Sequence, residues 1–75
     1  YPNPTDDKLT VILKPRLAIK DLYFLDFSGK FIKPKSVGRS GDNLDINVSN
    51  LNEGIYILEI VSDKEVDKVK VVIER

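Results

Sequence analysis

The feature that most constrains the fold is a two-residue alternation of apolar and polar side chains, which returns in short runs along the chain. It is clearest in the segment Leu44-Asp45-Ile46-Asn47-Val48, where three apolar residues alternate with two polar ones. A period of two places one kind of side chain on each face of a β-strand, and no stretch shows the 3.6-residue period of an amphipathic helix. Residues typical of turns separate the runs. The pattern therefore predicts an all-β chain.

Six runs are predicted to form strands, at residues 8–13, 19–27, 31–33, 44–48, 55–61 and 68–74. Residues 36–43 contain two glycines and little apolar content, so they predict a loop. In the second run, Leu22 and Phe24 share one face, while Tyr23 and Leu25 share the other, which predicts that both sides are covered. About six to seven short strands at regular spacing are typical of an Ig-like antiparallel β-sandwich.

The composition excludes several classes of function. The 75 residues include no His, Cys, Met or Trp, so a zinc site of ordinary ligands, a thiol nucleophile and a Ser-His-Asp triad are all excluded. The 12 basic residues balance the 12 acidic ones, which argues against bulk capture of nucleic acid. No apolar run approaches the length of a membrane span, so direct membrane insertion is not expected. We expect no enzyme activity and no cofactor.

Two acidic groups lack the spacing of a calcium loop and predict solvated side chains, namely Asp6 with Asp7, and Asp42 with Asn43 and Asp45. The chain begins at Tyr1 and contains no Met, so we expect residues 1–75 to be a single domain that is a fragment of a longer protein.

The segment Leu51-Asn52-Glu53-Gly54-Ile55-Tyr56 carries the most information. Leu, then Gly three residues later, then Tyr two after that, match the tyrosine corner of Ig-like sandwiches. In that motif a Tyr at the start of a late strand donates its hydroxyl to an upstream backbone group. Leu51, Gly54 and Tyr56 are therefore predicted to have structural roles.

The middle of the chain combines a turn with a basic run. Asp26 and Gly29 predict a β-turn, in which the carboxylate accepts bonds from local N–H groups and Gly takes a positive φ. Lys30, Lys33, Lys35 and Arg39 follow without an intervening acid until Asp42, and are interpreted as a solvated edge that blocks strand-to-strand aggregation. Pro34 limits the preceding strand to an edge or an end.

Four segments occur in one order, namely Tyr1-Pro2-Asn3-Pro4, Asp26-Phe27-Ser28-Gly29-Lys30, Leu51-Asn52-Glu53-Gly54-Ile55-Tyr56 and Lys68-Val69-Lys70-Val71-Val72-Ile73. With this order and spacing the chain resembles, over essentially its whole length, the type A C-terminal sorting domain of the type IX (Por) secretion system of Bacteroidetes. The resemblance implies a folded, non-catalytic signal at the C-terminus of a secreted cargo protein. Pro34 within a strand departs from the family pattern and puts that strand in doubt.

The resemblance also implies recognition residues and partners. The matching positions are Pro2, Asn3, Pro4, Gly29, Lys30, Gly54, Tyr56, Lys68 and Lys70. The implied partners are the type IX machinery, including its outer-membrane shuttle and sortase-like peptidase, and an N-terminal cargo domain. The implied route is export through the periplasm to the cell surface or the medium.

A structural or adhesive Ig-like module, carbohydrate-binding ones included, is the alternative, because such bacterial modules share the Pro-Asn-Pro start and the Gly-x-Tyr corner. A sugar-binding module would need a row of exposed aromatic residues, and the candidates here are Tyr1, Tyr23, Phe27 and Phe31. Whether a sorting signal of this kind docks by side chains of its last two strands or by adding its terminal strand to a partner sheet stays open, with side-chain docking preferred.

Overall fold

The computed structural model describes residues 7–15 and 17–74, and within them the chain forms seven strands and no helix. The strands are β1 (Lys8–Ile12), β2 (Ile19–Leu25), β3 (Phe31–Ile32), β4 (Ser36–Ser40), β5 (Asn43–Asn47), β6 (Gly54–Ser62) and β7 (Val66–Ile73). The described residues accordingly include no helix that is long and apolar enough to span a membrane.

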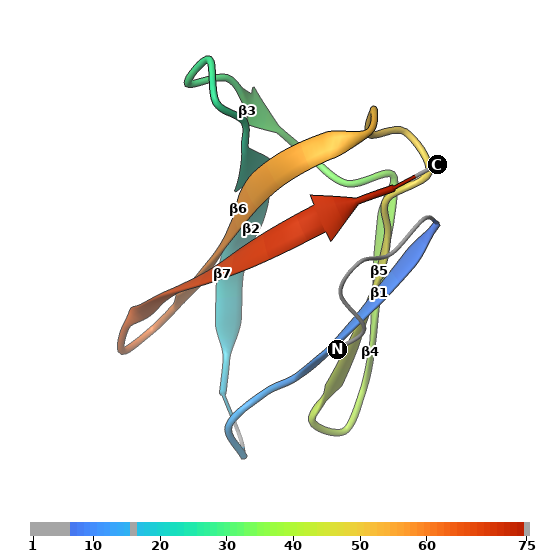
Figure 1. Ribbon diagram of the computed structural model, residues 1–75. Helices are drawn as coiled ribbons and strands as arrows, with labels where there is room; N and C mark the ends of the chain where they lie inside the picture. The colour runs from blue at the N-terminus through green and yellow to red at the C-terminus, as the bar shows by residue number, and fades with distance from the viewer. Residues whose placement is uncertain (1–6, 16, 75) are drawn as a thin grey trace.

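The strands form two antiparallel sheets that face each other (Figure 1). The small sheet has the order β1-β5-β4, and the large sheet has the order β3-β2-β6-β7. Neighbours in both sheets run antiparallel, and the longest ladder joins β6 to β7 from Gly54↔Ile73 to Val61↔Val66. The architecture is that of an Ig-like β-sandwich, which confirms the fold class expected from the two-residue alternation.

The core lies between the sheets and is built from the inward positions of each alternation. Phe24 at its centre is fully buried, and Leu58 lies opposite it on β6. Thirteen further apolar side chains complete the core: Leu9, Val11, Leu13, Leu17, Leu22, Leu44, Ile46, Val48, Leu51, Tyr56, Ile60, Val71 and Ile73. Burial of this apolar surface is the dominant stabilising term in a chain without disulfides.

The prediction of a loop at residues 36–43 is wrong. Ser36–Ser40 form β4, which pairs with β5 along its whole length. The two-residue connection has Gly41 at a φ of 61°, as a tight hairpin turn requires. All five residues of β4 are exposed, so the strand carries no apolar alternation and its pairing is held by backbone bonds.

The role expected for Arg39 is also different. Its guanidinium donates from Nε to the Gly41 carbonyl at 2.9 Å and from Nη1 to the Leu17 carbonyl. Arg39 thus ties the small sheet to the connection between β1 and β2, instead of standing as a solvated charge. A second cross-link joins Lys14 Nζ to both oxygens of Glu65, at 2.9 and 3.0 Å.

Candidate functional site

The corner at the start of β6 is held by one buried phenol. The Tyr56 hydroxyl donates to the Asn52 carbonyl oxygen at 2.7 Å, while its ring is buried and meets Phe24 edge-to-face at 6.1 Å. Gly54 has a φ of 158°, which residues with a Cβ rarely adopt. Leu51, which precedes the corner, is buried in the core. The hydrogen bond expected for a tyrosine corner is therefore present, and it fixes how the chain enters β6.

The turn between β2 and β3 is held by one carboxylate. Asp26 Oδ1 accepts from the backbone N–H groups of Ser28 and Lys30, both at 2.9 Å, and from Ser28 Oγ at 2.7 Å. The hydroxyl of Ser28 and these N–H groups lower the pKa of Asp26 below its ordinary value. Gly29 has a φ of 87°, a conformation open to glycine, as predicted.

The corner and the turn lie side by side at one end of the large sheet. The end of β2 pairs with the start of β6 at Leu25↔Ile57, so the turn that follows β2 comes next to the chain that enters β6. Together they line a shallow, open hollow of about 260 Å³, whose lining residues are Asp26, Phe27, Ser28, Glu53, Gly54, Ile55 and Tyr56. Two segments that are distant in the sequence thus form one continuous surface.

The outer face of the large sheet carries the two lysines of β7. Lys68 lies opposite Glu59, and Lys70 lies opposite Ile57, with both lysines exposed. Ile57 in turn lies opposite Leu25 on β2. Because side chains of directly paired residues point to the same side of a sheet, Lys70 continues a row that crosses β6 and β2.

The rest of this outer face is largely apolar. Its exposed or half-buried apolar residues are Tyr23, Leu25, Phe31, Ile55, Ile57, Val61, Val66 and Val72. The small sheet covers the opposite side, and no described element lies over this one (Figure 1). The expectation that both sides of β2 are covered is therefore wrong: Leu22 and Phe24 face the small sheet, while Tyr23 and Leu25 have only neighbours within their own sheet.

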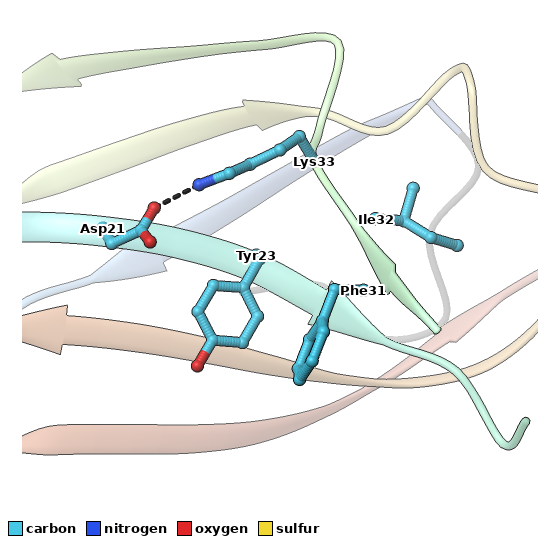
Figure 2. Close-up of a pocket in the computed structure, with 5 residues that line it drawn as sticks. All are labelled: Asp21, Tyr23, Phe31, Ile32 and Lys33. Carbon is cyan, nitrogen blue, oxygen red and sulfur yellow. Dashed lines mark hydrogen bonds and ion pairs between the residues drawn. The ribbon is translucent and has the colours of Figure 1, made fainter. Parts of the chain in front are cut away.

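A shallow notch opens at the β3 edge of this face (Figure 2). It measures about 350 Å³ and is lined by Asp21, Tyr23, Phe31, Ile32 and Lys33. The rings of Tyr23 and Phe31 meet edge-to-face, with centroids 5.1 Å apart, and project to the same side of the sheet. We call these five residues the aromatic notch.

The polar groups of the aromatic notch are all engaged within the chain. Lys33 Nζ bonds Asp21 Oδ1 and lies 5.8 Å from the centre of the Tyr23 ring. This ammonium group, followed by the Leu22 N–H, lowers the pKa of Asp21. The Tyr23 hydroxyl donates to Glu59 Oε1 at 2.9 Å, and that bond raises the pKa of Tyr23. The notch therefore offers apolar surface rather than unpaired polar groups.

The comparison with known families decides the identity of this sandwich. The model of the family described as a secretion system C-terminal sorting domain matches residues 1–74. The chain belongs to this family. It is the C-terminal sorting domain of the type IX secretion system, and its secreted, Bacteroidetes context follows from the family. No curated protein and no solved structure matches the chain.

Membership has direct consequences for function. A sorting signal is not itself catalytic, and it implies interaction with the type IX machinery and export to the cell surface or beyond. The resemblance inferred from the order of four sequence segments is thus confirmed, while the roles of individual residues in recognition stay predictions.

The structure brings some of the predicted recognition residues together. Gly29 and Lys30 lie in the turn beside Gly54 and Tyr56. Lys68 and Lys70 are placed further along the outer face of the sorting domain, and Pro2, Asn3 and Pro4 lie outside the described residues.

Sequence reasoning did not predict the aromatic notch as a site. Tyr23 and Phe31 appeared in it only as loose aromatic residues, and Lys33 only as part of a basic run. The available signal was the second apolar face of β2, formed by Tyr23 and Leu25, which the fold leaves without a covering layer.

Proposed function

We propose that the type IX machinery recognises this sorting domain as a folded unit, after its cargo has reached the periplasm. The outer-membrane shuttle would bind the sandwich, and the sortase-like peptidase would then separate it from the N-terminal cargo. Residues 1–75 act in this scheme without chemistry of their own.

The observation that carries this proposal is the convergence of the turn and the corner at one end of the large sheet. Asp26 bonds the backbone of its own turn, and the Tyr56 hydroxyl bonds the backbone of its own corner. The polar groups of both family segments therefore serve to fix shape. Such an arrangement supports a signal whose meaning depends on the fold, because an unfolded chain would present neither segment in this form.

The outer face of β6 and β7 is the proposed docking surface. Lys68 and Lys70 are exposed on one side of β7, which suits an acidic groove on the receptor. Charge complementarity of this kind increases the rate of association and suppresses wrong partners, while the apolar rows beside the lysines contribute affinity.

The decisive experiment fuses residues 1–75 to a periplasmic reporter in a bacterium that has the type IX system. We expect the reporter in the medium or on the cell surface. A reporter retained in the periplasm with its sorting domain folded would contradict the proposal.

Replacing Lys68 and Lys70 together with Gln should reduce export without changing the circular dichroism spectrum, and normal export of this variant would exclude the lysines as docking residues.

A variant with a disrupted core distinguishes recognition of the folded domain from recognition of its linear sequence. Leu58 is fully buried and lies in none of the four family segments. We expect Leu58→Asp to unfold the domain, because it buries an unpaired charge, while the sequence of all four segments stays unchanged. We expect export of the fusion to be lost. Export at the wild-type level from an unfolded Leu58→Asp domain would show that the machinery reads the sequence alone.

A further inference from the structure

We infer that the aromatic notch is the anchor pocket of the docking surface, and that it accepts one apolar side chain of a protein partner, with carboxylates beside that side chain. The inference rests on the proposed function and adds to it the chemistry of the partner. The observations behind it are the shape of the notch, the state of its polar groups and the charges around it.

The size and lining of the notch suit one side chain. Its volume of about 350 Å³ is at the low end of the range for ligand sites, and its apolar walls are the rings of Tyr23 and Phe31, because the Ile32 side chain packs against the core. Phe31 is 65% exposed although it lies within a sheet, so capping its ring would remove apolar surface from water. Partners commonly anchor in such pockets through a single apolar side chain.

The polar groups argue for an apolar guest over a sugar. Asp21 Oδ1 already accepts from Lys33 and from the Leu22 N–H, and the Tyr23 hydroxyl already donates to Glu59. A sugar needs several polar groups that converge on its hydroxyls. The two rings also stand 84° apart, so they do not form the flat platform on which a sugar ring stacks.

The charges around the notch argue for an acidic partner. On the face that holds the notch, the three exposed lysines Lys33, Lys68 and Lys70 outnumber the two acids Asp21 and Glu59. At the rim of the notch, the ammonium group of Lys33 balances the carboxylate of Asp21. A partner segment with Asp or Glu beside its apolar residue would be attracted by this excess of positive charge.

The notch is continuous with the docking surface proposed for β6 and β7. Phe31 pairs with Leu25, Leu25 pairs with Ile57, and Ile57 pairs with Lys70. One cross-strand row thus runs from the notch to the lysine edge. A partner that contacts both ends would bury an apolar centre between the balanced Lys33–Asp21 pair and the lysine edge, and an apolar centre with a polar rim is the anatomy of a specific interface.

Matched alanine variants in the reporter fusion test the notch. Phe31→Ala removes its main wall, while Ile12→Ala removes an equally exposed apolar side chain, 71% exposed, from the small sheet. We expect Phe31→Ala to lower the exported fraction about fivefold or more, and Ile12→Ala to leave it unchanged. Both variants should unfold at the same denaturant concentration as the wild type.

The outcomes separate the two proposals. If the wild-type fusion is not exported, the proposed function fails and the inference fails with it. If the wild type and Phe31→Ala are exported equally, the notch is not an anchor and the proposed function stands. If Phe31→Ala proves unstable, Phe31→Leu keeps an apolar wall, and full export of Phe31→Leu combined with loss in Phe31→Ala at matched folded fraction supports the anchor.

Cross-linking identifies the occupant. A photoreactive benzoylphenylalanine at position 31, with position 12 as the control, is activated during export, and the linked peptide is sequenced by mass spectrometry. We expect position 31 alone to link to an apolar residue flanked by Asp or Glu in a component of the type IX machinery. Links to a saccharide, to a second copy of this chain, to a basic segment, or equal yields from both positions would each overturn the inference.

Discussion

The two outer faces of the sandwich have opposite chemistry. On the small sheet, the outward positions are almost entirely polar, with Thr10 bonding Asp45 at 2.9 Å and with Asn47 at the end of the same strand. On the large sheet, the outward positions are mostly apolar, from Phe31 across Leu25 to Ile57. Both faces lie outside the same core. A solvated sheet needs only the first kind of surface, so the second kind indicates a surface kept for contact.

The difference is visible in how the strands alternate. In β5 each inward apolar residue is followed by an outward polar one, whereas in β6 the outward residues Ile55, Ile57 and Val61 are apolar as well. The only outward acid between them is Glu59, which lies between Tyr23 and Lys68. A strand with two apolar faces normally lies between two layers. Among the described residues, the small sheet covers the inner side of β6 and no element covers its outer side.

The largest expected effect tests whether the outer face acts as a second core. Leu58 and Ile57 are adjacent on β6 and point to opposite sides, with Leu58 fully buried and Ile57 half-buried. We expect Leu58→Ala to cost about 2–5 kcal/mol of unfolding free energy, a large part of the ~4–11 kcal/mol typical of a chain of this size. Ile57→Ala should cost about 1 kcal/mol, because less area is lost and no cavity forms.

Urea denaturation followed by circular dichroism measures both values. Equal losses for the two variants would mean that the outer apolar face is required for folding, and the argument that it is kept for contact would then fail.

How much of this could be predicted from the sequence differs between the faces. The inward face follows from alternation, and the corner follows from the spacing of Leu51, Gly54 and Tyr56. The strand β4 could not be found in this way, because its residues are all exposed and only pairing with β5 defines it. The short connection Gly41-Asp42 was the one local signal of that hairpin.

The aromatic notch was beyond sequence reasoning for a related cause. Tyr23 and Phe31 become neighbours only through the pairing of β2 with β3, and Lys33 reaches Asp21 only once that hairpin has formed. The apolar outward residues of β2 are also equally compatible with a strand covered by another layer of the same domain and with a strand that contacts a partner. Deciding between these needs the position of the second sheet, which no local pattern contains.

A middle-sized effect compares two tyrosines of the large sheet that point to opposite sides. Tyr56 points inward and its hydroxyl bonds the Asn52 carbonyl, while Tyr23 points outward and its hydroxyl bonds Glu59. We expect Tyr56→Phe to cost about 1–2 kcal/mol, because a partly buried carbonyl loses its donor. Tyr23→Phe should cost less than about 0.5 kcal/mol, since water replaces the lost bond.

Guanidinium denaturation of the two matched variants decides this prediction. A larger loss of unfolding free energy from Tyr23→Phe than from Tyr56→Phe would show that the hydroxyl on the outer face stabilises the fold more than the one at the corner. The outer face would then be a structural surface.

The smallest expected effect is electrostatic and belongs to the apolar face. Lys33 lowers the pKa of Asp21 below the ordinary 3.8, so the folded chain binds a proton here less readily than the unfolded chain. The stability contributed by this pair is therefore fully present above the ordinary value and is lost as the pH falls through the lowered one. Asp21→Asn should flatten the acid limb of the stability–pH curve slightly, because both partners are largely exposed.

A double-mutant cycle isolates that small term from the other acids. Asp26 and Glu65 also have lowered pKa values, from Ser28 and from Lys14, so the acid limb of the wild type contains their contributions too. Asp21→Asn and the double variant should lose the same pH-dependent increment, while Lys33→Gln should lose only the part that Lys33 causes, because the Leu22 N–H still bonds Asp21 in that variant. If the losses of the two single variants add in the double variant, Asp21 and Lys33 act independently. The charges at the rim of the notch would then not be paired, and the view of the notch as an apolar surface would be wrong.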